Sequence, residues 1–134
     1  MGKNILIVDD SPTLRASLSF CLTNAGHTIT EAVDGEDGLA KLAEIKKRGE
    51  IVSLIIADIN MPRMDGITFI REIKKTSFRF VPILVLTTES QENQKQAGKT
   101  AGAAGWMIKP FRPEDLLWII QKFTRRPYGS KTTT

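Results

Sequence analysis

The sequence predicts an α/β protein in which five parallel strands alternate with five helices. Short apolar runs alternate along the chain with longer segments whose apolar residues recur at helical spacing. The third run is apolar on successive positions, as expected for a strand covered by helices on both faces. With 134 residues and 41% hydrophobic content, the chain fits one compact domain. We expect this domain over residues 1–126, no separate output domain, and a disordered polar tail over 127–134.

The first unit begins with an apolar strand over residues 5–8. Ser11 and Pro12 then provide an N-cap and a proline at the first helical position. A helix should follow and end at Gly26. Its predicted inward residues are Leu14, Leu18, Cys21, Leu22 and Ala25.

The second and third units follow the same plan. We expect a strand over 28–32 and a helix over 36–48 that Gly49 ends, then a strand over 54–57 and a helix over 66–75. The inward side of the helix over 36–48 should carry Leu39, Leu42, Ala43 and Ile45.

The last two units differ from each other in the strength of their helices. Pro82 precedes a strand over 83–86, and a final strand over 106–108 leads to a helix over 113–123. The apolar stripe of that helix consists of Leu116, Leu117, Ile120 and Phe123. In contrast, residues 91–104 contain Gly98, Gly102, several alanines and no large aliphatic or aromatic side chain. This helix is either an exposed element that packs poorly or an element that moves.

Three aspartates directly follow two of the predicted strands. Asp9 and Asp10 follow the strand over 5–8, and Asp58 follows the strand over 54–57. Ligands of open α/β sheets bind at the carboxyl ends of strands, so the three acids converge if these strands are neighbours. Two carboxylates about 4 Å apart repel by about 4 kcal/mol at an effective dielectric constant of 20. A divalent cation such as Mg²⁺ compensates this repulsion and suits phosphate chemistry. Each acid taken alone is also compatible with an ordinary turn or capping role.

Two further polar residues occupy corresponding positions after strands. Thr87 follows the strand over 83–86, and Lys109 follows the strand over 106–108. A lysine supplies a point charge for phosphate oxygens, and a hydroxyl donates one hydrogen bond to them. Alone, each is equally an ordinary strand-end residue or a surface cation, but their matched positions favour a shared pocket.

Composition excludes several other classes of protein. The net charge of +4 suggests nucleic acid, but the basic residues cluster at predicted helix ends, and neither a zinc-ligand spacing nor an aromatic-rich basic stripe is present. No stretch is long and apolar enough for a membrane span and the start does not resemble a signal peptide, so we expect a cytoplasmic protein. Cys21, the single cysteine, is predicted to be a small buried side chain.

In these motifs the chain resembles the receiver domain of two-component response regulators, over residues 3–123. The resemblance rests on four segments: Val8-Asp9-Asp10-Ser11, the run from Asp58 to Gly66 (DINMPRMDG), Leu86-Thr87-Thr88, and Lys109-Pro110-Phe111. It implies a flavodoxin-like (βα)5 three-layer sandwich with a parallel sheet in the order 2-1-3-4-5. The family also has a cis Lys109–Pro110 bond.

The resemblance implies a role for each site residue. Asp58 would accept the phosphoryl group, and Asp10 and Asp58 would hold Mg²⁺, for which Mn²⁺ would be a substitute. Asp9 would act mostly through metal-bound water, and the backbone carbonyl of Asn60 would complete the protein ligands. Lys109 and Thr87 would bind the phosphoryl group. Asn60 and Glu89 would flank the path of the hydrolytic water.

The same resemblance implies a switch. In the family, Thr87 moves toward the phosphoryl group and an aromatic residue swings inward. The aromatic residue here is Trp106, whose indole is larger than the tyrosine of many chemotaxis members and donates only through its ring N–H. We predict that phosphorylation alters residues 91–104 most, because they lie between Thr87 and Trp106.

The expected function is therefore that of a CheY-like phosphoprotein in signal transduction. It would catalyse its own phosphotransfer and dephosphorylation without being an enzyme for other substrates. The phosphodonor would be a CheA-like sensor histidine kinase, and the output partner a flagellar motor switch protein in chemotaxis, with a phosphatase as a further partner. A phosphorelay intermediate or a phosphate sink is the alternative.

Two other classes share parts of this pattern. A phosphatase of the haloacid-dehalogenase type would need an Asp-x-Asp motif after the first strand, whereas the acids here are adjacent. A flavin or dinucleotide carrier would need a glycine-rich turn after Val8, where this chain has acids.

Overall fold

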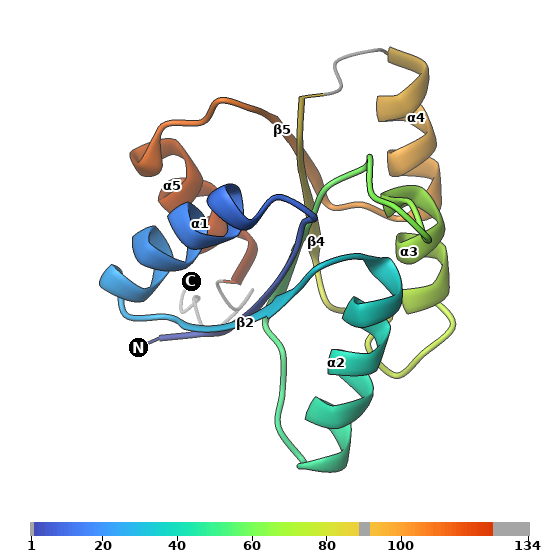
Figure 1. Ribbon diagram of the computed structural model, residues 1–134, viewed down its shortest axis with the longest axis horizontal. Coiled ribbons are helices and arrows are strands. Elements are labelled where there is room, and N and C mark those ends of the chain that lie inside the picture. Colours follow the sequence, from blue (N-terminus) through green and yellow to red (C-terminus); the bar gives the residue numbers. More distant parts are fainter. Residues whose placement is uncertain (1, 89–91, 125–134) are drawn as a thin grey trace, which may run out of the picture.

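The structure, a computed structural model, describes residues 2–88 and 92–124. Five strands and five helices alternate along them (Figure 1). The strands are β1 (Asn4–Val8), β2 (Thr28–Ala32), β3 (Leu54–Ala57), β4 (Ile83–Thr87) and β5 (Gly105–Ile108). The helices are α1 (Pro12–Asn24), α2 (Gly35–Lys47), α3 (Gly66–Ile73), α4 (Glu92–Ala101) and α5 (Pro113–Thr124).

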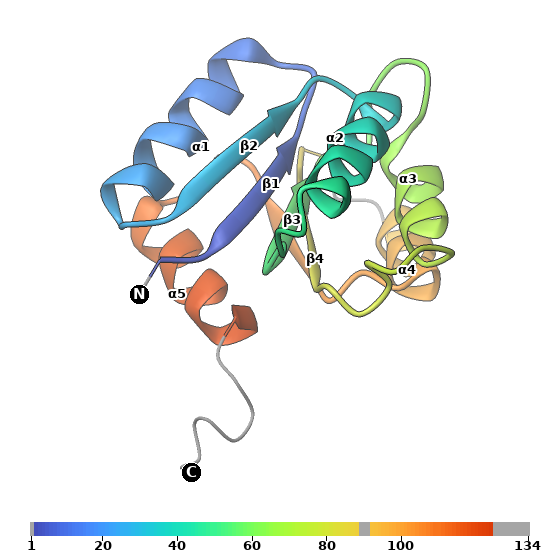
Figure 2. The same ribbon diagram turned by 90° about the horizontal axis from the view of Figure 1, so that it is seen from below.

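The strands form one parallel sheet in the order β2-β1-β3-β4-β5. The predicted flavodoxin-like fold is therefore confirmed. Helices α1 and α5 cover one face of the sheet, and α2, α3 and α4 cover the other (Figures 1 and 2). The strand order places β1 beside β3, with Val8 opposite Ala57. The adjacency on which the acidic pocket depends is thus present.

The core has two halves because successive strand residues face opposite sides of the sheet. Leu6 and Val8 pack into the half beneath α2, α3 and α4. Ile5 and Ile7 pack into the half beneath α1 and α5. Strands β3 and β4 are buried along their whole length, which explains their uninterrupted apolar runs.

The predicted start and end of the first helix are confirmed. The Ser11 side chain accepts a hydrogen bond from the Leu14 N–H, and Pro12 is the first helical residue. Gly26 has a φ of 96°, a left-handed conformation that favours glycine. Leu18 and Leu22 are buried on the predicted inward side, and Leu14 and Cys21 are partly buried against the same half of the core. Ala25 is exposed, so its assignment to this side is wrong. In α2, Ala43 is likewise exposed.

Several element ends differ from the sequence-based bounds. Strands β1 and β5 each begin one residue earlier than predicted, α2 begins and ends one residue earlier, and α5 ends one residue later. Helix α4 ends at Ala101, three residues before the predicted end. Helix α3 ends at Ile73 rather than at Lys75. The Thr76 hydroxyl donates to the Ile73 carbonyl and accepts from the Phe78 N–H, which turns the chain and buries Phe78. Thr87 is the last residue of β4 rather than the residue after it.

Some predictions lie outside the described residues. These are the domain boundary at residue 126, the tail over 127–134, and the role of Glu89; the predicted segment 91–104 is described from residue 92 onward. Among the helices that the structure describes, none is long and apolar enough to cross a membrane.

Candidate functional site

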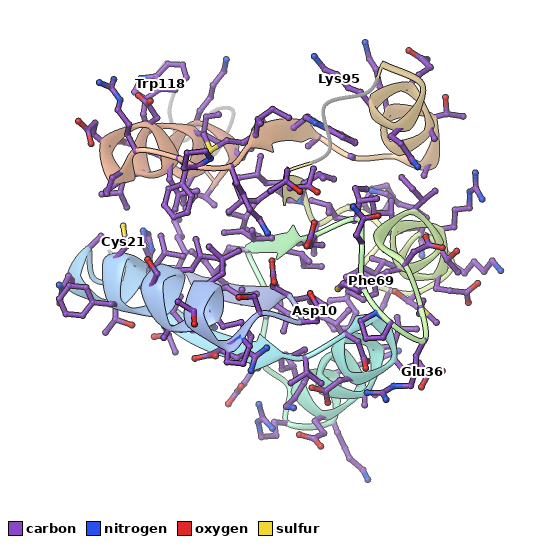
Figure 3. All side chains as sticks on the ribbon, turned by 45° about the horizontal axis from the view of Figure 1, so that its top comes forward. Asp10, Cys21, Glu36, Phe69, Lys95 and Trp118 are labelled. Atoms are coloured by element: carbon purple, nitrogen blue, oxygen red, sulfur yellow. The ribbon has the colours of Figure 1, made fainter. Side chains whose placement is uncertain are left out.

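The three aspartates meet at the carboxyl ends of β1 and β3. Carboxylate oxygens of Asp9, Asp10 and Asp58 lie within 4.8 Å of one another. Asp9 and Asp58 are only 2% and 8% exposed, whereas Asp10 faces solvent. Figure 3 shows Asp10 between the two helical layers. The predicted convergence of the acids is confirmed, and one of them remains open to an incoming cation.

Lys109 reaches this cluster from the end of β5. Its Nζ lies 3.1 Å from Asp9 Oδ2 and 3.4 Å from Asp58 Oδ2. Its backbone N–H donates to the Thr87 carbonyl at 2.8 Å, which fixes the base of the side chain. The Lys109–Pro110 peptide bond is cis, as the resemblance implies. One cation faces three carboxylates, so negative charge is in excess.

Asp9 is held by several donors. Its Oδ1 accepts from the Ser11 N–H at 2.8 Å, and its Oδ2 accepts from Lys109. Burial raises the pKa of Asp9, while the Ser11 N–H and Lys109 act in the opposite direction. The carboxylate of Asp10, in contrast, makes no hydrogen bond or ion pair within residues 2–88 and 92–124.

Asp58 is fixed by its own neighbour and by the loop that follows. Its Oδ1 accepts from the Ile59 N–H at 2.7 Å, which leaves Oδ2 toward Lys109. The Gly66 N–H donates to the Ile59 carbonyl at 2.8 Å and closes the base of the loop over residues 59–65. A Cβ on Gly66 would lie 2.1 Å from the Asp58 carbonyl oxygen, so only glycine fits there. Asn60 is exposed in this loop, and its carbonyl stays a predicted ligand.

The two switch candidates lie on neighbouring strands. Thr87 is fully buried at the end of β4. Trp106 of β5 pairs with Val85, which precedes Thr87 by two residues on β4. The Trp106 indole is partly buried, and its Nε1 has no hydrogen-bond partner in the described part of the chain. Their movements on phosphorylation stay predictions.

Sequence reasoning missed two contacts around the acids. The Arg15 guanidinium of α1 donates to the Asp9 carbonyl at 2.6 Å and pairs with Glu31 at 3.3 Å. Asp34 pairs with Arg63, and this ion pair joins two loops. The position of Arg15 one turn after Ser11 was a usable signal for the first contact, but no local signal connects Asp34 with Arg63.

The donor set is suited to a hard cation. The ligand atoms that the structure brings together are carboxylate oxygens, with no thiolate or imidazole in the described cluster. Mg²⁺ prefers one or two carboxylates combined with water and phosphate oxygens, whereas Zn²⁺ is usually held by nitrogen and sulfur. The residues present therefore fit Mg²⁺.

The sequence and the fold are similar to those of known receiver domains. The family model of the response regulator receiver domain matches residues 5–121. Chemotaxis protein CheY4 of Vibrio cholerae has a similar structure, with 40% identity, a TM-score of 0.82, and coverage of 92% of this chain and 99% of CheY4. Protein PilG of Pseudomonas aeruginosa is 33% identical over 90% of this chain and 86% of PilG.

A longer relative matches as well. The alkaline phosphatase synthesis transcriptional regulatory protein PhoP of Bacillus subtilis is 35% identical over 126 residues, which are 94% of this chain and 50% of PhoP. The chain thus spans about half the length of that relative. Since the family model covers most of the sequence and PilG is matched over most of both chains, this chain belongs to the response regulator receiver domain family.

Proposed function

We propose that this protein is a phosphorylation switch whose phosphoacceptor is Asp58. The observation that carries the proposal is the position of the buried Asp58 carboxylate beside two other carboxylates and 3.4 Å from the Lys109 Nζ. A side-chain oxygen of Asp58 attacks phosphorus in line, and the bond from phosphorus to the phosphohistidine nitrogen of the donor breaks. The imidazole leaves with the electron pair of that bond.

Lys109 neutralises charge on the transferring oxygens, because its Nζ already lies beside the nucleophile. The Thr87 hydroxyl lies at the end of β4, the strand beside β3, and is the second proposed partner of the phosphoryl group. The Ile59 N–H orients the Asp58 carboxylate through Oδ1. These residues position the reactants without themselves exchanging a covalent bond.

The proposed Mg²⁺ ligands are the carboxylates of Asp10 and Asp58 and the carbonyl of Asn60, with Asp9 contributing through water. When bound, the cation neutralises phosphoryl oxygens and offsets the repulsion among the acids. The exposed carboxylate of Asp10 supports this assignment, since Asp9 is already engaged by Lys109 and Ser11.

The signal is proposed to pass by phosphorylation-dependent protein binding in chemotaxis. A sensor histidine kinase would be the donor and a flagellar motor switch protein the receiver of the signal. The 40% identity to a chemotaxis protein over 99% of its length supports this pathway. A phosphorelay intermediate or phosphate sink is the alternative, and a motor protein that binds equally well with and without phosphorylation would favour it.

Incubation with acetyl phosphate and Mg²⁺, followed by intact-mass measurement, tests the site. We expect one added phosphoryl group in the wild type, none in Asp58→Asn, and normal incorporation in Asp115→Asn, a matched change at an exposed aspartate of α5. Equal incorporation in Asp58→Asn would contradict the assignment. Steady hydrolysis of unrelated phosphate esters would instead favour a phosphatase.

A further inference from the structure

The turn at Arg63 has an unusual backbone. Among the described residues other than glycine, Arg63 alone has a positive φ, of 64°. The Met64 N–H donates to the Pro62 carbonyl at 2.7 Å across this turn. Glycine and asparagine accept a left-handed conformation more readily than arginine, so a long charged side chain there indicates a compensating contact.

That contact is with Asp34, which directly precedes α2 and is only 1% exposed. Asp34 Oδ1 accepts from the Asp37 N–H at 2.9 Å and caps α2, while Oδ2 accepts from the Arg63 guanidinium. The Arg63 Nε also lies 3.7 Å from a carboxylate oxygen of the exposed Glu36, which Figure 3 labels at the start of α2. Arg63 therefore provides the positive partner of a buried charge.

A second contact holds the same loop beside the ion pair. Met64 packs on Gly35, where an added Cβ would lie 2.9 Å from the Met64 Cγ. The loop over residues 59–65 is thus fixed at two places: its base is closed by Gly66 and Ile59, and its tip is held against the turn before α2. Asn60 lies between these two places.

We propose that Arg63 and Asp34 form a clamp that positions the loop, and with it the backbone carbonyl of Asn60, for the divalent cation. This inference rests on the proposed function, because it concerns the same metal site. Arg63 is a positioning residue in this scheme and does not touch the cation. The two members of the clamp are distant in sequence, since they are 29 positions apart.

Electrostatics and positioning predict opposite effects for one variant. Arg63→Gln removes a positive charge from the loop that follows Asp58, so a purely electrostatic influence would tighten Mg²⁺ binding. Loss of positioning would weaken it. Asp34→Asn removes a negative charge but keeps a good helix cap, so it isolates the ion pair from the cap of α2.

The test is a calorimetric titration of the unphosphorylated full chain with Mg²⁺ alone. We expect Arg63→Gln and Asp34→Asn each to weaken Mg²⁺ binding by about tenfold. The double variant should bind Mg²⁺ no more weakly than the single variant with the lower affinity, because both substitutions break the same ion pair. Arg63→Lys, which keeps the charge, should recover part of the loss. Arg48→Gln, the same change at an exposed arginine following α2, should stay within about twofold of the wild type.

The outcomes separate this inference from the proposed function. If the wild type binds Mg²⁺ and accepts a phosphoryl group but Arg63→Gln binds Mg²⁺ equally well or more tightly, the clamp is overturned and the switch stands. If the wild type does neither, both proposals fall. If Arg63→Gln unfolds, the folded Arg63→Lys and Asp34→Asn variants decide, and wild-type Mg²⁺ affinity in both overturns the clamp.

Discussion

Helices α3 and α4 lie on the same face of the sheet and each follows a strand that ends at the acidic site, but they are held differently. Helix α3 buries four large apolar side chains, which are Ile67, Phe69, Ile70 and Ile73. The described side chains of α4 that contact the core are alanines, with Gly98 buried between them. Because burial of apolar area supplies most of the stabilising free energy, α4 should separate from the sheet at a lower cost than α3.

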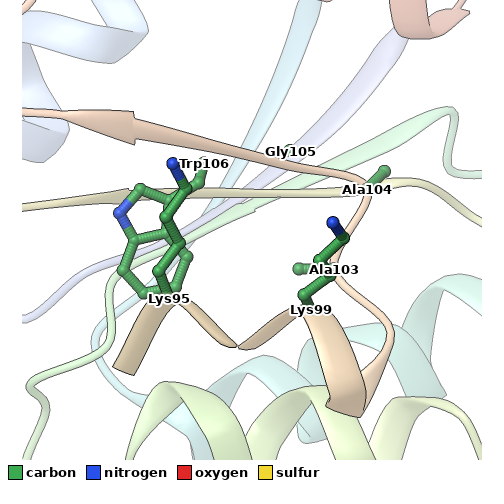
Figure 4. Close-up of a pocket in the computed structure, with 6 residues that line it drawn as sticks. All are labelled: Lys95, Lys99, Ala103, Ala104, Gly105 and Trp106. Carbon is green, nitrogen blue, oxygen red and sulfur yellow. The ribbon is translucent and has the colours of Figure 1, made fainter. Parts of the chain in front are cut away.

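The surroundings of α4 show the same difference. Gly98 faces the Trp106 indole, and Gly102, with a φ of 117°, lies against the aliphatic stem of Lys74. A cavity of about 180 Å³ lies beside the indole, between α4 and β5 (Figure 4). An element that rests on small residues beside open space can shift with little loss of packing. This is the physical basis for the prediction that α4 responds to phosphorylation.

The largest expected effect contrasts the two helices directly. Phe69→Ala in α3 should lower the free energy of unfolding by about 3–5 kcal/mol, because it leaves a cavity in the core. Ala97→Gly in α4 should cost only about 1 kcal/mol, mainly through helix propensity. Urea denaturation of both variants measures this contrast. Equal costs would show that α4 is anchored as firmly as α3.

A second prediction concerns the contact between α4 and the indole. An added Cβ at Gly98 would lie 2.7 Å from the Trp106 ring, so Gly98→Ala should destabilise the protein by about 1–3 kcal/mol. Helix propensity alone predicts the opposite sign, a gain of about 1 kcal/mol. Urea denaturation of Gly98→Ala, made in the wild type and in a Trp106→Leu background, separates the clash from the helix propensity. Removal of the indole should let Gly98→Ala raise the free energy of unfolding. Stabilisation with the indole present would contradict the contact.

Much of the fold followed from local patterns in the chain. Uninterrupted apolar runs predicted β3 and β4 because both faces of those strands are covered, and Ser11-Pro12 predicted the start of α1. The adjacency of β1 and β3 came only from the resemblance, since strand order is a long-range property. The end of α3 was misplaced because the Thr76 hydroxyl, rather than a glycine or proline, turns the chain.

The acidic site was predictable to the same degree. Strand-end positions identified Asp9, Asp10, Asp58 and Lys109, and the structure brings them together. The pairing of Arg63 with Asp34 was not predictable, because it joins two loops whose approach depends on the packing of α2 beside α3. The difference between Asp9 and Asp10 in exposure also required the three-dimensional structure, as the two are adjacent in sequence.

A third prediction asks whether α4 responds to the acidic site. Amides of α4 should exchange faster than those of α3 in the unmodified protein. A phosphoryl mimic such as beryllofluoride with Mg²⁺ should change exchange in α4 by about fivefold, the lower range of coupling between sites, with a smaller change in α3. Hydrogen–deuterium exchange measured by mass spectrometry tests this, with Asp58→Asn as the control that should not respond. Identical protection of α4 with and without the mimic would refute its role as the responding element.

The smallest expected effect extends the comparison to α2, the third helix on this face. Desolvation by burial raises the pKa of Asp37, but the Val33 N–H and Lys41 outweigh this effect and lower the pKa below its ordinary value of 3.8. A carboxyl whose pKa is lower in the folded state contributes stability above the unfolded pKa and loses it as the pH falls through the folded pKa.

Asp37→Asn should therefore cost about 0.5 kcal/mol at pH 7, the usual size of a helical ion pair one turn apart. The difference from the wild type should shrink as the pH falls from 5 toward 3, and thermal unfolding across that range measures it. A difference that stays constant with pH would assign the cost to the shape of the side chain rather than to its charge. The described contacts of Asp37 are all within α2 or directly before it, so amide exchange in α4 should be unchanged in this variant. A change in α4 would mean that the helices on this face do not respond independently.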